Sequence, residues 1–298
     1  MSNDLSPADF ELISRLALDR AAIVLESGKE YLVSSRLGKL AREEGFADAS
    51  GLCDAVRRER SRGPITTKVI EAMTTNETLF FRDARPFDAL RKVVVPELME
   101  ARRTSKSLTV WSLACSTGQE PYSIAMLLRE HFPELANWRV KIVAADLSTE
   151  VLAKAAEGVF NQLEVNRGLP APMMVRYFDR QGTQFRIKSE IRSMVDFRPI
   201  NLAERIMLSP KPDVVFLRNV MIYFDVSTRE RILREVGAQM APDGYLFLGA
   251  GETTLNLDVP FDRIDLERTN CFRPRGVGSR AITPKEESWN RPSTTFAR

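Results

Sequence analysis

The sequence predicts an α/β protein, in which an all-helical N-terminal domain precedes a Rossmann-like domain with a small inserted β-subdomain. Three observations predict this fold class. Apolar residues recur at helical spacing in residues 1–75, strand-like and helix-like segments alternate from about residue 107, and residues 158–193 interrupt that alternation. Such alternation is typical of a mostly parallel sheet with helices on both faces.

The first 75 residues carry the signals of successive helices. Ser6-Pro7-Ala8-Asp9 offers an N-cap, a proline at the first helical position and an acid three residues after the cap. Apolar spacing predicts further helices over 31–44, over about 49–60 and after Pro64. Because no Rossmann-like signal precedes residue 105, we predict a separate helical domain over residues 1–75.

The second domain is expected to span residues 76–272. Its predicted strands are 108–114, 140–145, 194–198, 213–217 and 244–249, and its predicted helices are 120–131, 149–157 and 228–240. Residues 158–193 are interpreted as a subdomain between the second and third strands, with a short helix over 172–177 and a hairpin around 180–183. Residues 273–298, rich in Gly, Pro, Ser and Thr, are predicted to be a disordered tail.

Composition narrows the class of protein. The net charge is +3, but residues 273–298 carry six Lys and Arg against two Glu, which leaves 37 basic and 38 acidic residues in the preceding 272. This near-neutral body argues against a nucleic-acid partner. Three widely spaced cysteines (Cys53, Cys115, Cys271) form no zinc or disulfide pattern and fit a reducing cytoplasm. No apolar run approaches the roughly 20 residues of a membrane span, and the N-terminus lacks signal-peptide features. We expect a cytoplasmic protein without metal or direct membrane insertion.

Residues 111–123, WSLACSTGQEPYS, predict a ligand-binding turn. A strand leads through small residues to Gly118 and a helix start, so a ligand can approach backbone N–H groups at a helix N-terminus. The next predicted strand ends at Asp146, where a carboxylate can bind the two hydroxyls of a ribose. The pair favours an adenosine-type cofactor over a plain structural turn, although one glycine alone is weak evidence. The sequence argues against a dehydrogenase, because the G-x-G-x-x-G fingerprint is missing.

The residue content limits the chemistry. The only histidine, His131, lies at a predicted helix end, which excludes most zinc hydrolases and Ser-His-Asp hydrolases. Methyl transfer to a carboxylate needs no strong general base, because the nucleophile is already anionic at pH 7. Two polar stretches could serve a ligand, TTNETLFFRD (74–83) and the segment Leu217-Arg218-Asn219-Val220 after a buried strand. A helix cap followed by core aromatics remains the alternative for the first stretch.

Six segments together resemble the chemotaxis-receptor glutamate methyltransferases, the CheR family. They are TTNETLFFRD (74–83), WSLACSTGQEPYSIAM (111–126), AADLSTEVLAKA (144–155), NL (201–202), VVFLRNVMIYFD (214–225) and PDGYLFLGAGE (242–252). The resemblance covers most of residues 70–252. It implies an S-adenosylmethionine-dependent methyltransferase domain that esterifies glutamate side chains on receptor coiled-coil helices, with S-adenosylhomocysteine as the second product.

The resemblance also implies residue roles. The methionine part of the cofactor or the transfer site would be contacted by Asn76, Thr78 and Arg82. Glu120 would bind the cofactor's amino group, and Asp146 the ribose. The adenine would be flanked by Asn201 and Leu202, and the methionine end by Asn219 and Val220. Arg82 and Tyr223 are candidates for orienting the substrate carboxylate, since a guanidinium can hold a carboxylate in a defined plane. Gln119 stands where the family commonly has an acid, and AGE (250–252) where Ser-Glu is common; neither coincides with these positions.

Partner recognition is expected to involve the helical domain, which in the family helps to hold the receptor. The basic stripe Arg36, Lys39 and Arg42 could face acidic receptor helices or be a solvated helix face. The loop at 179–185 is short and lacks extra glycines, so we expect no docking of a receptor C-terminal pentapeptide there. The rival functions are a nucleic-acid methyltransferase, which predicts steeply salt-dependent binding, and a non-catalytic adenosylmethionine sensor or scaffold.

Overall fold

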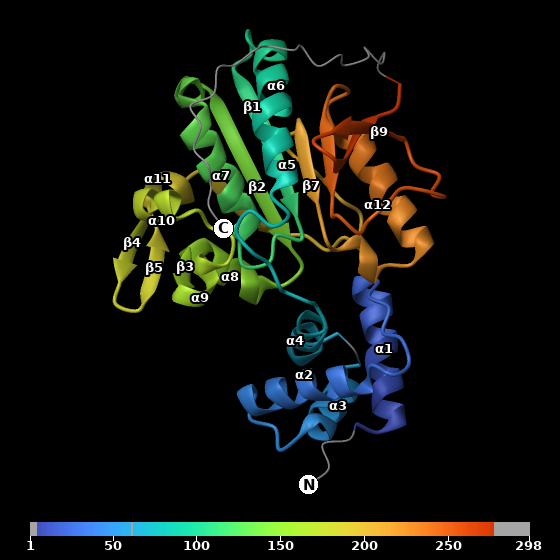
Figure 1. Ribbon diagram of the computed structural model, residues 1–298. Helices are drawn as coiled ribbons and strands as arrows, with labels where there is room; N and C mark the ends of the chain where they lie inside the picture. Colours follow the sequence, from blue (N-terminus) through green and yellow to red (C-terminus); the bar gives the residue numbers. More distant parts are fainter. Residues whose placement is uncertain (1–4, 61, 277–298) are drawn as a thin grey trace.

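The computed structural model describes residues 5–60 and 62–276. In this part of the chain four N-terminal helices gather beneath the sheet (Figure 1), namely α1 (Pro7–Ala21), α2 (Glu30–Glu43), α3 (Ala49–Arg58) and α4 (Pro64–Ala72). They share a core of their own, which includes Ile13, Leu37, Leu52 and Val69, each fully buried. The Ser6 hydroxyl accepts the Asp9 N–H at 3.1 Å and caps α1, as the sequence predicts.

Seven strands of the described chain form the main sheet, in the order β6-β2-β1-β7-β8-β10-β9. Their bounds are β1 (Ser107–Leu113), β2 (Arg139–Asp146), β6 (Val195–Pro199), β7 (Val214–Leu217), β8 (Tyr245–Leu248), β9 (Phe261–Leu266) and β10 (Thr269–Pro274). The five predicted strands pair in parallel. The antiparallel β9–β10 hairpin, which pairs with β8 through β10, was not predicted. The chain moves outward from β1 through β2 to β6 and returns at β7 on the other side of β1. Ligands bind at such a switch point.

Helices cover both faces of the sheet. They are α5 (Arg85–Ala89), the π-helical turn η1 (Leu90–Val94), α6 (Val95–Ala101), α7 (Gln119–His131), the short η2 (Pro133–Asn137), α8 (Thr149–Glu157), the short η3 (Met221–Tyr223) and α12 (Val226–Gln239). Successive residues of β7 alternate between the two faces. Val214 and Phe216 pack in the cluster that includes α5 to α7, whereas Val215 and Leu217 pack with α12.

The predicted insertion is a small antiparallel sheet, in the strand order β3-β5-β4, between α8 and β6 (Figure 1). Its elements are β3 (Val159–Asn161), α9 (Gln162–Asn166), α10 (Ala171–Tyr177), β4 (Phe178–Gln181), β5 (Gln184–Ile187) and α11 (Ser189–Arg192). Phe80 joins it to the 74–83 segment, because its ring lies edge-on to Phe160 at 5.0 Å and to Phe178 at 5.7 Å between centroids.

The C-terminal part of the described chain differs from the sequence prediction of a tail that begins at residue 273. β10 continues to Pro274. Arg273 and Pro274 pair with β9, and Arg273 also donates to Glu97 Oε2 at 2.7 Å, with its guanidinium over the Tyr245 ring at 4.4 Å. The rest of the predicted tail, residues 277–298, lies outside the described residues. No helix in the described ranges has the length and apolar character needed to span a membrane.

Candidate functional site

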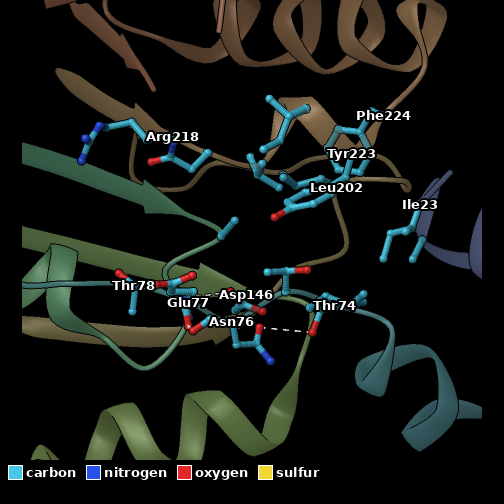
Figure 2. Close-up of a pocket in the computed structure, with 18 of the residues that line it drawn as sticks. Ile23, Thr74, Asn76, Glu77, Thr78, Asp146, Leu202, Arg218, Tyr223 and Phe224 are labelled. Atoms are coloured by element: carbon cyan, nitrogen blue, oxygen red, sulfur yellow. Dashed lines mark hydrogen bonds between the residues drawn. The ribbon is translucent and has the colours of Figure 1, made fainter. Parts of the chain in front are cut away.

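A pocket opens at the carboxyl ends of β1, β2 and β7, where the strand order reverses. All ten residues predicted as site residues line it, namely Asn76, Thr78, Arg82, Glu120, Asp146, Asn201, Leu202, Asn219, Val220 and Tyr223. Figure 2 shows Leu202 and Tyr223 on one side of the pocket and Asp146 and Asn76 on the other. Ala21, Ile23 and Met73 of the N-terminal helical part also line it.

The turn between β1 and α7 has an unusual backbone. Ala114 and Ser116 have φ angles of 57° and 50°, and Gly118 has a φ of 92°. Glycine is favoured here, because L side chains rarely adopt this φ and a Cβ would lie only 3.0 Å from the Cβ of Ala155 and 3.2 Å from the Tyr122 ring. This backbone turns the Ser116 N–H toward Asp146 and the Ser116 hydroxyl toward the Asn76 carbonyl, at 2.8 Å each.

Asp146 is a buried carboxylate at the end of β2, only 7% exposed. Its Oδ2 accepts the Ser116 N–H at 2.8 Å, and its Oδ1 accepts the Ser148 N–H at 3.1 Å. Burial raises the pKa of Asp146, while these backbone hydrogen bonds act in the opposite direction. Because an ionised carboxylate has about four acceptor positions, Asp146 can still accept from a ligand in the pocket.

Glu120 lies in the first turn of α7 and is paired within the protein. Its Oε1 accepts the Ser112 hydroxyl, and its Oε2 accepts Arg218 Nη1, both at 2.8 Å. Arg218 Nη2 also donates to Asp83 Oδ2 and to the Arg82 carbonyl at 2.8 Å each. The Arg218 side chain is 1% exposed, and its Nε has no hydrogen-bond partner among the described residues. A buried guanidinium thus links α7, the end of β7 and the 82–83 loop.

Arg218 was not predicted as a site residue, although it lies in a segment that the sequence singles out. A charged residue directly after the continuous apolar strand Val214–Leu217 is the signal that could have identified it. Charged residues are almost never fully buried unless they are paired. Its position therefore indicates an internal ion pair at the edge of the sheet where ligands bind.

The 74–83 segment forms the strained wall of the pocket. Phe81, Asp83 and Ala84 have φ angles of 49°, 63° and 21°. Such conformations cost on the order of 1–3 kcal/mol each and persist only where the surroundings hold them. The Phe81 N–H donates to the Ser123 hydroxyl at 2.9 Å, and Arg218 holds the next two residues. Among the described residues, the Arg82 side chain has one hydrogen-bond partner, the Glu77 carbonyl at 3.0 Å.

The N-terminal helical part contacts the site directly. Asn201 Nδ2 donates to the Arg20 carbonyl at 2.7 Å, and the Val24 N–H donates to the Tyr223 carbonyl at 3.1 Å. Glu71, at the end of α4, accepts the Thr149 N–H at 3.0 Å and so caps the start of α8 from outside.

The basic stripe predicted on α2 is not uniform. Arg36 donates to the Met73 carbonyl at 2.6 Å and to the Thr75 hydroxyl at 2.9 Å, beside the pocket. Burial lowers the pKa of Arg36, an effect that nearby Tyr223 opposes. Lys39 and Arg42 are exposed, with Lys39 paired to Glu43 at 3.7 Å. Lys39 and Arg42 are therefore the most exposed residues of the stripe.

The pocket suits a ligand with an aromatic ring, hydroxyl groups and both signs of charge. Ile23, Leu147 and Leu202 offer apolar surface, Asp146 and Glu120 offer acceptors, and the Arg82 guanidinium offers N–H donors. No group of three or more His, Cys, Asp or Glu in residues 5–60 and 62–276 could hold a metal ion. Cys53, Cys115 and Cys271 are free and buried.

Comparison with known families and proteins covers both parts of the chain. Residues 8–74 match the family model described as CheR methyltransferase, all-alpha domain, and residues 76–269 match CheR methyltransferase, SAM binding domain. Chemotaxis protein methyltransferase 1 of Pseudomonas aeruginosa is 43% identical over 272 residues, which is 90% of this chain and 98% of the relative. The Pseudomonas putida methyltransferase Cher2 is 41% identical, over 82% of this chain and 90% of the relative.

More distant relatives follow the same pattern. The Escherichia coli chemotaxis protein methyltransferase is 39% identical, over 86% of this chain and 88% of its own. Among solved structures, a glycopeptide N-methyltransferase complexed with S-adenosylmethionine aligns at a TM-score of 0.31 and 16% identity, over 63% of this chain and 60% of the other.

Proposed function

The chain belongs to the CheR methyltransferase family, and on that premise we propose that it methylates glutamate side chains of chemotaxis receptors to glutamyl methyl esters. It is an S-adenosylmethionine-dependent methyltransferase of chemotaxis. One observation carries the choice of a carboxylate as methyl acceptor. Arg82, whose side chain makes one hydrogen bond within the described part of the chain, lines the same pocket as Asp146 and Glu120, the two carboxylates proposed to bind the cofactor.

The residues of the pocket fit S-adenosylmethionine, whose sulfonium supplies an electrophilic methyl group and leaves as a neutral thioether. We assign Asp146 to the ribose hydroxyls and Glu120 to the amino group. We assign the remaining cofactor contacts by position: Asn201 and Leu202 to the adenine, and Asn76, Thr78, Arg82, Asn219 and Val220 to the methionine end. Arg218, which donates to Glu120 Oε2 at 2.8 Å, supports the assignment of Glu120, because it holds that carboxylate at the pocket.

A glutamate acceptor needs alignment rather than deprotonation. Its carboxylate, with an ordinary pKa near 4.3, is anionic at pH 7. The work of the protein is then to hold oxygen, methyl carbon and sulfur in line and to exclude water. Arg82 has further N–H donors to hold a carboxylate in a plane, and we propose Tyr223, on the side of the pocket opposite Asp146 in Figure 2, as its partner in orienting the substrate.

We also propose how the receptor is held. Lys39 and Arg42 are exposed on α2 and could meet acidic receptor helices. Docking of a receptor C-terminal pentapeptide is not expected, because β4 ends at Gln181 and β5 begins at Gln184, which leaves a turn of residues 182–183. The free, buried cysteines support a cytoplasmic location.

Transfer of a radiolabelled methyl group to receptor signalling domains tests this function. Label that is released by base and maps to glutamate is expected, in equal amount with and without the last five receptor residues. A label that requires those five residues would contradict pentapeptide independence. Tight cofactor binding with no label on any receptor would favour the sensor reading, and label on nucleic acid would favour the other methyltransferase class.

Substitution of Asp146 by alanine is expected to weaken cofactor binding by roughly 1–3 kcal/mol, the scale for losing a charged hydrogen-bond partner. The affinity of the unmodified protein should also fall as the pH is lowered through the raised pKa of Asp146, starting above the ordinary value of 3.8. The reason is that protonation removes the charge that favours the ribose hydroxyls. Calorimetry across pH measures both effects. If Asp146→Ala binds as tightly as the unmodified protein, the ribose assignment is wrong.

A further inference from the structure

We propose that Glu252 is a positioning residue, which fixes the loop 218–223 and so sets the methionine end of the pocket. Glu252 follows β8, and its own N–H donates to the Gly249 carbonyl at 3.0 Å. It is 5% exposed, although it carries a carboxylate. A buried carboxylate persists only where its acceptor positions are filled.

The carboxylate is satisfied by the backbone alone. Its Oε2 accepts the N–H groups of Asn219 at 2.9 Å and Gly249 at 2.6 Å. Its Oε1 accepts those of Val220 at 2.9 Å and Met221 at 2.7 Å. These four donors fill the acceptor positions of one carboxylate. No salt bridge to Glu252 is found in the described residues, so its bonds to the 219–221 backbone are its function within the fold.

The bonded backbone is one that needs support. Asn219 has a φ of 59°, a left-handed conformation that asparagine tolerates better than most residues. Gly249 leaves room for the contact, because a Cβ there would lie 2.7 Å from Glu252 Oε2 and 2.9 Å from the Asn219 N. On the other side, Asn270 of β10 donates to the Gly249 and Glu252 carbonyls at 2.9 and 2.8 Å.

The loop held in this way carries pocket residues. Asn219, Val220 and Tyr223 line the pocket, and the segment begins at Arg218. AGE (250–252) coincides with none of the predicted site positions in the sequence, whereas in the structure Glu252 bonds directly to two of them, Asn219 and Val220. An error of about 1 Å in aligning reacting groups costs on the order of 100-fold in rate. The inference therefore predicts an effect on turnover, and it rests on the proposed receptor methylation only for its assay.

Substitution of Glu252 by glutamine tests the proposal. The amide keeps the shape of the side chain, but its NH₂ group faces two backbone donors. We expect kcat for receptor methylation to fall on the order of 10-fold or more, with the receptor KM within about twofold, because the exposed surface is unchanged. Asp262→Asn, an exposed acid on β9 paired to Arg275, is the matched control and should retain full kcat.

The outcomes separate positioning from simple stabilisation. If Glu252→Gln or Asn270→Ala lowers the melting temperature but leaves kcat unchanged well below it, the proposal is overturned. If Glu252→Gln does not fold, the folded Asn270→Ala variant decides, with a smaller fall in kcat expected at unchanged KM. If the unmodified protein methylates no receptor, the proposed function fails instead. The position of loop 218–223 is then tested by the affinity for S-adenosylmethionine, which Glu252→Gln should weaken severalfold. Equal affinity of the two proteins would overturn the inference.

Discussion

Substitution of Arg218 by methionine is expected to lower the free energy of unfolding by about 3–5 kcal/mol, the usual cost of removing one partner of a buried ion pair. The Glu120 carboxylate, 9% exposed, would keep only the Ser112 hydroxyl as a partner. The strained loop at 81–84 would also lose the two bonds that Arg218 makes to it. Urea denaturation with a linear extrapolation to water measures the change.

A matched surface arginine controls for this loss. Arg176, 61% exposed, pairs with Glu130 at 2.9 Å, so Arg176→Met should cost less than about 1 kcal/mol. Adding Glu120→Gln to Arg218→Met should recover part of the stability, because the unpaired buried charge is then gone. Equal costs for the two arginine variants, or no recovery in the double variant, would contradict the account of Arg218 as a buried clamp.

Substitution of Arg82 by lysine is expected to lower kcat for methyl transfer roughly 100-fold, because an ammonium cannot hold a carboxylate through two parallel N–H bonds. Cofactor affinity should fall much less, since the charge remains. Steady-state kinetics with receptor signalling domains, together with calorimetry, separates the two quantities. Arg85→Lys is the control, because Arg85 lies three residues away, is exposed and does not line the pocket. If Arg82→Lys keeps the kcat of the unmodified protein, Arg82 does not orient the substrate.

Much of the main sheet could be predicted, because its strands are apolar runs bounded by turns. β9 could not: in Phe261–Leu266 only the two end residues are buried, so the run has no apolar signal. The helical stretch from Arg85 to Ala101 was likewise not predicted. Pro96 interrupts its pattern, and the π-helical turn η1 ends directly before Val95-Pro96.

The lining of the candidate pocket could be predicted where a residue's place in a local motif brings it there. Asp146 follows from the end of a strand, and Gly118 from a turn, so short spacings suffice. Glu252 and Glu71 could not be found in this way, because Glu252 accepts backbone N–H groups 31 to 33 residues away and Glu71 accepts the Thr149 N–H 78 residues away. Contacts of this kind leave no periodicity or local pattern in the sequence. Only the fold shows that they reach the pocket.

The walls of the pocket come from both halves of the chain, since Ile23 and Met73 belong to the N-terminal part and Asp146 and Asn219 to the domain of the main sheet. A ligand that touches both walls binds the docked arrangement of the halves, so its binding free energy adds to that of docking. Thermodynamic reciprocity then requires that a partner which stabilises the docking of the two halves also raises the affinity for the cofactor. A receptor helix lying across α2 and the pocket mouth would therefore bind with positive cooperativity toward the methyl donor.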